Sequence, residues 1–176
     1  MPVKTFNSYN QPKKDPIWIA ARDGDMQSVE CELQYTDVDI NKKDGPGHQW
    51  TPLHIAVFKG HVEITSVLID AGVDVNCTTI NEITPLHTAA QNGFVNICID
   101  LIDHGAVINA EDIWGATPLY YAVSSSNERI VWLLLKMGAN PMIRTKDGVN
   151  ICDMAFKMGL KDIFHLLMST AIQMRM

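Results

Sequence analysis

One short motif returns along the chain at a fixed interval of 33 residues. The tetrapeptide Thr-Pro-Leu-His occupies residues 51–54 and 84–87, and Thr-Pro-Leu-Tyr follows at 117–120. A period of this length indicates one supersecondary unit stacked on copies of itself, because such a unit buries its apolar face only against its neighbours. The sequence therefore predicts a repeat array.

Each copy of the motif carries the residue types that begin and end helices. Thr51 stands where a helix N-cap is needed, and Pro52 follows at the first helical position, where its missing N–H costs nothing. Gly60 and Gly93 are placed to end this short helix, since glycine tolerates the left-handed conformation of a C-cap. Ser126 replaces the glycine in the third copy. A second stretch with helical apolar spacing follows each time, so a helix-turn-helix unit with a projecting loop is expected.

This pattern resembles the ankyrin repeat. The tetrapeptide, the glycines, the period and the loop endings Asp-Val-Asn (74–76) and Val-Ile-Asn (107–109) all agree with it. The resemblance implies an all-α solenoid of helix-turn-helix units with β-hairpin-like finger loops. We expect a flexible N-terminal extension and five units, of which the first and last are capping repeats. The expected boundaries are 1–14 for the extension and 15–47, 48–80, 81–113, 114–146 and 147–176 for the units.

Two departures from the pattern predict local changes in structure. Pro16 and Pro52 lie 36 residues apart, three more than the period. One extra residue is placed near 33–36 and two within 43–50, which lengthens the first finger. Asp100 falls where the second helix of its unit should present an apolar core residue. Because an unpaired buried carboxylate is costly, Asp100 is expected either to have a partner or to lie on a locally rotated helix.

The composition argues against several function classes. The formal net charge of −6 disfavours a general nucleic-acid binder, which needs a clustered basic surface. No apolar run approaches the roughly 18 residues that cross a bilayer, and the four cysteines lack the short spacing of zinc ligands. No secretory signal is recognised, and free thiols favour a reducing compartment. We expect a cytoplasmic location, with the nucleus as an alternative, and no membrane, nucleic-acid or metal partner.

The motif histidines are the residues that most suggest catalysis or metal binding. In the family that the chain resembles, this histidine hydrogen-bonds the backbone of the adjacent loop and holds the loops in register, and we expect this role for His54 and His87. Tyr120 takes the same position in the third copy, which suits a structural role and not a metal site. The chain has no glycine-rich phosphate loop and no Gly-x-Ser-x-Gly motif. We therefore expect no enzymatic activity and no cofactor.

Asn76 and Asn109 occupy a loop position with two interpretations. In the family, an asparagine here can be a substrate for asparaginyl hydroxylation, so both residues are candidate modification sites. The favoured alternative is an asparagine that ties the loop through its side chain. In either case these residues carry no catalysis of their own.

The resemblance implies that a protein partner binds the concave surface formed by the finger tips and the first helices. A solvated loop tip has no structural need for Trp or Ile, and exposed apolar patches tend to mark interaction sites. Six residues are predicted to form an apolar row, called here the finger row: Trp50, Phe58, Ile80, Ile83, Ile113 and Trp114. The alternative for Trp50 or Ile83 is packing on the neighbouring finger. The predicted polar contacts are Lys59, Asn81, Gln91, Asn92, Ser124 and Ser125.

Ile99 and Trp132 form a second candidate surface. They occupy equivalent places on second helices, where the family usually carries charged, outward-facing residues. The pair could mediate self-association or bind a second partner on the convex side, although a Trp that covers its own unit explains it equally well. We expect a monomeric, non-catalytic interaction module acting as adaptor, inhibitor or scaffold, whose partner the sequence does not identify. Two alternatives stay open: a scaffold that self-assembles through Ile99 and Trp132, and a substrate-recruiting fragment of a larger enzyme.

Overall fold

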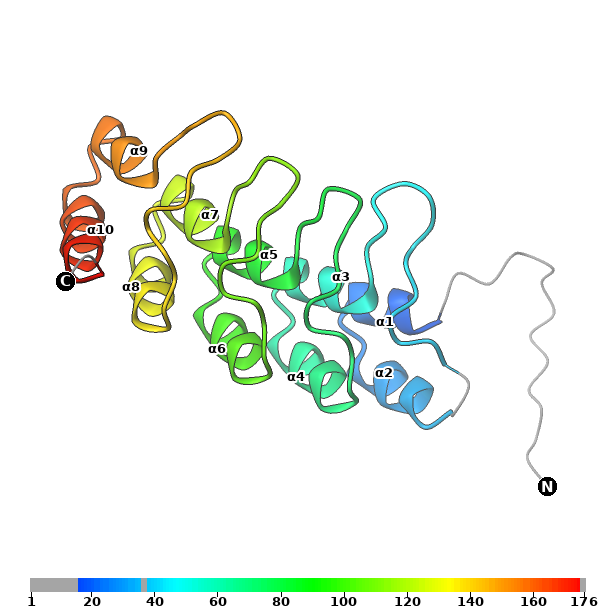
Figure 1. Cartoon of the computed structure of the whole chain (residues 1–176). Helices are drawn as coiled ribbons and strands as arrows, with labels where there is room; N and C mark the ends of the chain where they lie inside the picture. The colour runs from blue at the N-terminus through cyan, green and yellow to red at the C-terminus, as the bar shows by residue number, and fades with distance from the viewer. Residues whose placement is uncertain (1–15, 36–37, 175–176) are drawn as a thin grey trace, which may run out of the picture.

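The computed structural model describes residues 16–35 and 38–174, in which ten α-helices follow one another as five pairs (Figure 1). In chain order the helices are α1 (Pro16–Asp23), α2 (Met26–Leu33), α3 (Pro52–Lys59), α4 (Val62–Asp70), α5 (Pro85–Asn92), α6 (Val95–Asp103), α7 (Pro118–Ser124), α8 (Glu128–Lys136), α9 (Ile151–Lys157) and α10 (Lys161–Gln173). The predicted all-α solenoid is confirmed. Each predicted unit range contains one helix pair, and the boundaries themselves stay a prediction. The predicted extension of residues 1–14 lies outside the described residues.

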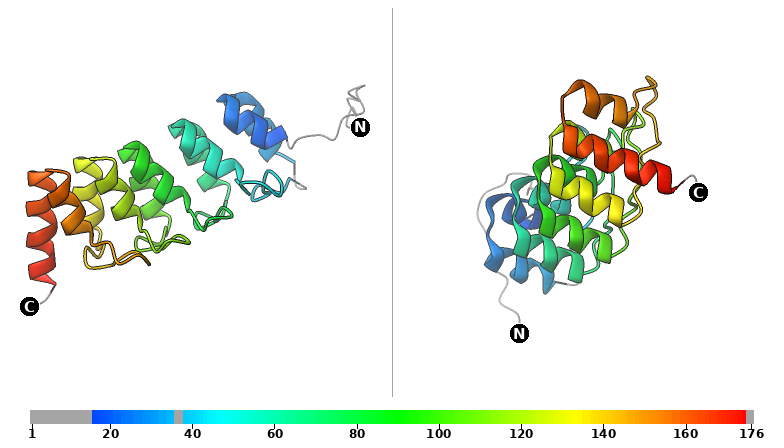
Figure 2. Two further views of the ribbon diagram at one scale, coloured as in Figure 1. Left: turned by 90° about the horizontal axis from the view of Figure 1, so that it is seen from above. Right: turned by 90° about the vertical axis from the view of Figure 1, so that its left-hand side faces the viewer.

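The helix pairs stack in two layers. The first helices α1, α3, α5, α7 and α9 lie side by side, and the second helices pack beside them as the other layer (Figures 1 and 2). The finger loops extend from the side of the first helices (Figure 1). Alanine is fully buried at equivalent places in the first helices, for example at Ala56, Ala89 and Ala122. A side chain this small lets neighbouring helices approach closely.

The predicted helix starts are confirmed. Thr51, Thr84 and Thr117 are the N-caps of α3, α5 and α7, and a proline occupies the first turn of each helix. In α3 and α5 the motif histidine completes a capping box: the Thr hydroxyl accepts from the His backbone N–H, and the His ring accepts from the Thr backbone N–H. The four-residue motif thus provides acceptors for backbone N–H groups at the helix N-terminus that have no partner within the helix.

The glycines that end the first helices are required by two features at once. Gly60 and Gly93 have φ values of 73° and 81°, in the left-handed region. A Cβ atom on Gly60 would also lie 2.8 Å from the ring of Phe94 in the next unit. Ser126, which replaces this glycine in the fourth unit, adopts the same left-handed conformation with φ 58°. An L-residue pays roughly 1–2 kcal/mol for that conformation, so Ser126 is a strained position.

Replacing Ser126 with glycine is expected to raise the free energy of unfolding by about 1 kcal/mol, because the strain is relieved and both backbone hydrogen bonds of the residue are kept. Urea denaturation followed by circular dichroism measures this. Ser125→Gly is the matched control: Ser125 has φ −93°, so glycine adds only unfolded-chain entropy there and should lower stability by up to about 1 kcal/mol. Equal destabilisation by both changes would contradict the strain at Ser126.

The lengthened first finger is confirmed. Its closing hydrogen bond runs from the N–H of Asp44 to the carbonyl of Trp50, across six residues. The next finger closes from Thr79 to Ile83, across four. The difference equals the two extra residues predicted within 43–50. The extra residue near 33–36 stays a prediction, because residues 36 and 37 lie outside the described part of the chain.

Asp100 has partners, which confirms the first of the two alternatives expected for this residue. Ser66 on α4 donates from its hydroxyl to Oδ2 of Asp100 at 2.6 Å. His104, one turn further along α6, places Nδ1 2.8 Å from the backbone carbonyl of Asp100 and 3.2 Å from its Oδ1. The hydrogen bond to this carbonyl, followed by the nearby carboxylates, raises the pKa of His104. The carboxylate thus joins two neighbouring units.

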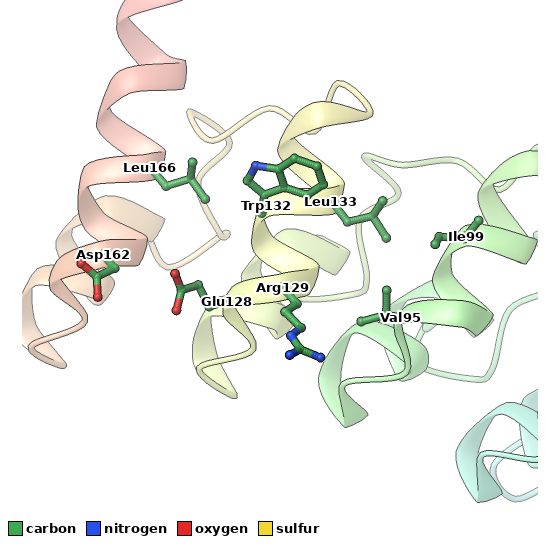
Figure 3. Close-up of a pocket in the computed structure, with 8 residues that line it drawn as sticks. All are labelled: Val95, Ile99, Glu128, Arg129, Trp132, Leu133, Asp162 and Leu166. Atoms are coloured by element: carbon green, nitrogen blue, oxygen red, sulfur yellow. The ribbon is translucent and has the colours of Figure 1, made fainter.

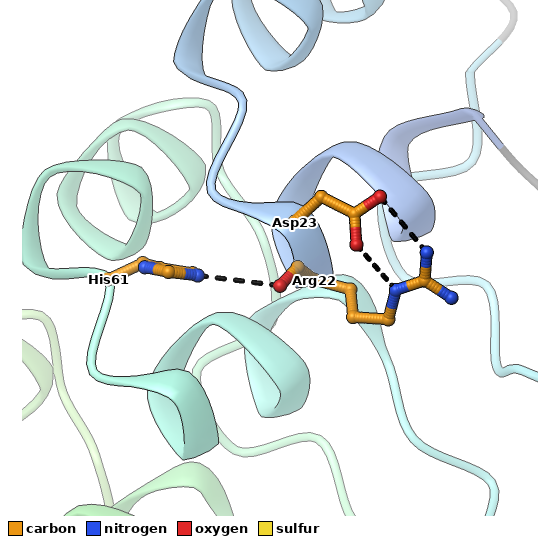
Figure 4. A network of polar contacts seen from close by, with 3 residues as sticks. All are labelled: Arg22, Asp23 and His61. Carbon is orange, nitrogen blue, oxygen red and sulfur yellow. Dashed lines mark hydrogen bonds and ion pairs between the residues drawn. The ribbon is translucent and has the colours of Figure 1, made fainter.

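Side chains at the start of the second helices hold successive units together. His61 extends Nε2 to the carbonyl oxygen of Arg22 in the preceding unit, at 3.4 Å, and Arg22 pairs with Asp23 (Figure 4). The His61 ring covers Gly24, where a Cβ atom would lie 2.9 Å from it. Asn127 has the same role two units later, donating from Nδ2 to carbonyl oxygens at the end of α5. These contacts fix the spacing of the layer that carries the fingers.

Candidate protein-binding surface

The four fingers are joined tip to tip by backbone hydrogen bonds. In each case an N–H of one finger donates to a carbonyl of the preceding finger. The three bonds are Ile80 N to His48 O at 3.1 Å, Ile113 N to Asn81 O at 3.1 Å, and Lys146 N to Trp114 O at 2.8 Å. The tips therefore form one continuous ladder and not four independent loops.

A polar side chain also braces each finger from inside. Asp44, Thr79, Asp112 and Thr145 occupy the same place in their fingers, and each accepts a hydrogen bond from a backbone N–H on the returning strand. Asp112 is the most heavily used of the four. Its carboxylate accepts from the N–H groups of Trp114 and Ala116, both at 2.9 Å, and from the Tyr121 hydroxyl at 2.8 Å.

The finger row divides into exposed and half-buried residues. Phe58, Ile80 and Trp114 are 46%, 51% and 49% exposed. Trp50, Ile83 and Ile113 are half-buried. Of the predicted polar contacts, Asn81 is half-buried and the other five are exposed: Lys59, Gln91, Asn92, Ser124 and Ser125.

Trp50 illustrates why some residues of the finger row are less exposed than the sequence suggests. Its ring packs edge-on against Phe58, with centroids 5.1 Å apart, and rests against the hydrophobic core. Ile83 is held by its backbone, whose carbonyl accepts from Nε2 of His54. Trp50 therefore packs on α3 of its own unit, while Phe58 is partly open to solvent, and packing on the neighbouring finger stays a prediction.

Tyr121 belongs to this surface and was missed from the sequence. Its ring meets His87 edge-on at 5.4 Å, and its hydroxyl binds Asp112. Burial, and then the hydrogen bond to the carboxylate, raises the pKa of Tyr121. In the repeat register Tyr121 replaces Ile55 and Thr88. The aromatic residue at this variable position is the sequence feature that could have indicated Tyr121 as part of the surface.

The motif histidines have the structural role that was predicted. Nε2 of His54 donates to the carbonyl of Ile83 at 3.0 Å, and Nε2 of His87 donates to the carbonyl of Ala116 at 3.1 Å. The tautomer follows from the capping box, since Nδ1 accepts from a backbone N–H and the proton must lie on Nε2. Burial lowers the pKa of His54 to about 4 and lowers that of His87 as well. Both rings are therefore neutral at physiological pH.

Asn76 and Asn109 tie neighbouring loops together. Asn76 accepts from the N–H of Val107 at 2.8 Å and donates to the carbonyl of Gly105 at 3.0 Å. Asn109 makes the same pair of contacts one unit later, with the N–H of Asn140 and the carbonyl of Gly138. The tie expected of these side chains is present. Hydroxylation at either residue stays a prediction.

Ile99 and Trp132 lie on one groove across the second helices (Figure 3). They are 40% and 51% exposed, and the groove has a volume of about 630 Å³. Its lining comes from α6, α8 and α10: Val95, Ile99, Glu128, Arg129, Trp132, Leu133, Asp162 and Leu166. The ammonium of Lys136 lies 4.9 Å from the centre of the Trp132 ring. Trp132 thus contacts its own helix, and a binding role for the pair stays a prediction.

Two buried thiols lie in surroundings that suppress their reactivity. Burial raises the pKa of the Cys77 thiol to about 11 and that of Cys98 to about 12, which keeps both protonated and unreactive. Among residues 16–35 and 38–174 no group of three or more His, Cys, Asp or Glu side chains could hold a metal ion. None of the described helices has the length and apolarity to cross a membrane.

Known proteins resemble this chain through its repeats. A family model described as "Ankyrin repeats (3 copies)" matches residues 3–79 and 65–145. Ankyrin repeat and SAM domain-containing protein 3 of Homo sapiens is 41% identical over 63 residues, which is 36% of this chain and 9% of that protein. Probable E3 ubiquitin-protein ligase XBOS32 of Oryza sativa subsp. japonica is 40% identical over 57 residues, 32% of this chain and 11% of the relative.

Ankyrin repeat-containing protein P1E11.10 of Schizosaccharomyces pombe is 37% identical over 60 residues, 34% of this chain and 28% of the relative. The chain thus matches only a minor part of each of these proteins. The family model, in contrast, matches well over half of the chain, and the helix pairs, capping boxes and finger ladder agree with it. The chain belongs to the ankyrin repeat family.

Proposed function

We propose that this protein is a non-catalytic interaction module that binds a protein partner across its finger row. The observation that carries the proposal is the backbone ladder between finger tips, which holds the exposed side chains of Ile80 and Trp114 in one register. Phe58 adds a third exposed apolar side chain, on α3. Ankyrin repeats generally mediate protein–protein interaction. The buried free thiols suit a reducing compartment, so we place the protein in the cytoplasm or nucleus.

Rigidity supports this use of the fingers. Ordering a flexible loop on binding costs roughly 0.5–1.5 kcal/mol for each immobilised side chain, and a pre-formed surface avoids much of that cost. Here the tips of the second, third and fourth fingers are each fixed to the preceding finger, and all four fingers are braced from inside. A few anchors can then supply useful affinity. Trp114 is the strongest candidate anchor, because Trp is enriched among residues that dominate interface energetics.

The partner is expected to offer an apolar surface to the finger row and hydrogen-bonding groups to the polar residues beside it. Gln91, Asn92, Ser124 and Ser125 lie exposed on or beside the first helices and can exchange hydrogen bonds with it. This division into apolar anchors and a polar rim is the usual composition of a protein interface. Tyr121 extends the apolar part toward α7.

The proposal predicts that Phe58→Ala, Ile80→Ser and Trp114→Ala together weaken partner binding at least about a hundredfold, since each anchor contributes on the order of 1–2 kcal/mol. Affinity capture from source-cell lysate, identified by mass spectrometry, finds the partner, and titration calorimetry measures the loss. The three side chains are about half exposed, so the variant should stay folded, with only a small loss of stability from the Phe58 contact with Trp50. Ile99→Ser with Trp132→Ala is the matched control on the convex groove. A partner retained by the finger variant and lost by the control would overturn the proposal.

A recruiting role inside a larger enzyme is the second candidate function. One observation favours it: the relative named as a probable E3 ubiquitin-protein ligase matches this chain over only 11% of its own length. In that arrangement the finger row would bind the substrate and another domain would carry the chemistry. The full-length transcript tests this candidate, because a catalytic domain in the same reading frame would support it.

A further inference from the structure

The outer face of the last helix pair, α9 and α10, is unlike the corresponding faces of the earlier pairs. In α3, α5 and α7 the residues Val57, Ala90 and Val123 occupy one repeat position and are completely buried. Each of these helices is followed by another unit that packs against it. Phe156 has the same position in α9 and is 71% exposed. The side chain that elsewhere meets the next unit thus meets solvent here.

The second helix of the pair repeats this observation. Phe164 is half-buried where Thr65 and Cys98 are fully buried. Met168 is 39% exposed where Ile69 is 5% exposed. Ile172 is 58% exposed, and Val73, Ala106 and Ala139, its equivalents, are at most 8% exposed. We call the four residues Phe156, Phe164, Met168 and Ile172 the end face.

The end face is a single apolar surface. The rings of Phe156 and Phe164 contact each other, with centroids 5.7 Å apart. Met168 and Ile172 follow Phe164 at i+4 and i+8 on α10, and they line a hollow of about 240 Å³ together with residues of α9 and the fourth finger. In Figures 1 and 2 this helix pair forms one extremity of the solenoid, at the opposite end from α1 and α2. No described element covers it.

The opposite extremity has the polar character that a terminal repeat requires. Ser28 and Glu32 of α2 take the positions at which α4 has the buried Ile64 and Leu68. Both α2 residues are partly exposed. Within the described residues, the first unit therefore presents polar groups at its outer side, whereas the last unit presents two Phe, a Met and an Ile.

We propose that a second copy of this chain covers the end face, so that two solenoids join through α9 and α10 about a two-fold axis. The surface is continuous with the unit-to-unit interfaces, where the same positions are always covered by a helix pair of this shape. The chain itself supplies such a pair. The sequence-based expectation of a monomer took no account of this exposed surface.

Polarity and charge select the two-fold arrangement. In a head-to-tail arrangement the end face would meet Ser28 and Glu32 and would bury a carboxylate against apolar groups, which is costly. In a two-fold arrangement apolar surface meets apolar surface. Exposed charges of both signs lie at the end face: Asp153 and Arg144 line the hollow with Met168 and Ile172, and Lys157 follows Phe156 on α9. Two copies can therefore approach at this end despite the net charge of −6 on each chain. An isologous contact closes at two copies.

Sedimentation equilibrium of the full chain from about 1 to 100 μM tests the proposal. Wild type is expected at twice the 19.6 kDa of one chain. Phe156→Lys with Ile172→Lys is expected to raise the dissociation constant at least about a hundredfold and to sediment as one chain, because it places four ammonium groups in the interface. Both side chains are exposed, so the thermal melting curve of the isolated chain should not change. Trp132→Lys on the convex groove is the matched control and should remain a dimer.

Three outcomes would overturn the proposal. A wild type that does not exceed the mass of one chain at 100 μM would show that a different protein covers the end face or that nothing does. A mass that grows beyond two chains would indicate an open, head-to-tail contact. Dissociation by Trp132→Lys and not by the end-face variant would assign self-association to the groove. None of these residues belongs to the finger row, so partner capture can succeed or fail independently.

Discussion

Acidification from pH 7 to pH 4.5 is expected to lower the free energy of unfolding by about 2–3 kcal/mol through His54 alone. Burial of the ring lowers its pKa from 6.5 to about 4 in the folded protein. Between these values the unfolded chain binds a proton and the folded chain does not. Stability therefore falls as the pH falls through this window and is constant above it. His87, whose pKa burial also lowers, adds to the effect in the same direction.

Other titrating groups do not cancel this trend. His104 has a raised pKa, so its contribution is present below pH 6.5 and is lost as the pH rises, the opposite sign. Its side chain is exposed, and solvent screening keeps that contribution small. Asp23 and Asp25 have lowered pKa values because they accept hydrogen bonds from Arg22 and Ser28. Their contribution is lost only in stronger acid, below the window of the histidines.

His54→Gln with His87→Gln removes both titrations and keeps part of the local structure. Glutamine is the common residue at this capping-box position, so it can still accept from the Thr N–H at the N-cap. At pH 7 each change should cost about 1–2 kcal/mol, for the lost hydrogen bond to the next finger. Urea unfolding between pH 4.5 and 7.5 should then be nearly independent of pH. His165→Gln, at an exposed site, is the control and should keep the wild-type slope. An unchanged slope in the double variant would assign acid sensitivity to other groups.

The fold could be predicted from the sequence because each unit is local. A helix pair, its caps and its finger are specified within 33 residues, and only neighbouring units touch. Thr51, Pro52 and Gly60 therefore have the same structural roles as their equivalents one period later. The loop ties through Asn76 and Asn109 follow the same logic. The replacement of glycine by Ser126 could be seen in the sequence, and only the backbone angle shows that it is strained.

The candidate surfaces were harder to predict, because exposure depends on what lies in the next unit. Trp50 looked like a free anchor, yet it packs on Phe58. Asp100 looked out of place until Ser66, one unit away, was seen to bind it. The apolar character of Phe156 was visible in the repeat register, but a pattern of apolar residues does not say whether a neighbour covers them. Tyr121 was overlooked because a variable position carries no motif.

The second large effect is expected at Asp112, the buried brace of the third finger. Asp112→Ala should lower the free energy of unfolding by about 3 kcal/mol, since it leaves two backbone N–H groups and the Tyr121 hydroxyl without their acceptor. Asp112→Asn keeps the shape and one acceptor oxygen, so about half of the loss is expected. Glu111→Ala removes the same charge from the adjacent exposed position and should stay within about 0.5 kcal/mol of wild type.

Two terms oppose each other at this site, and the experiment decides between them. Burying the carboxylate, which is 1% exposed, costs desolvation energy that its removal recovers. The three hydrogen bonds offset that cost, and two of their donors are backbone groups that cannot turn away to water. Chemical denaturation of the three variants measures the balance, and the same variants report on function.

If Asp112 holds Trp114 in place for a partner, Asp112→Ala should weaken binding more than Glu111→Ala even under conditions where both are folded. Equal stability of these two alanine variants would show that desolvation and hydrogen bonding cancel here.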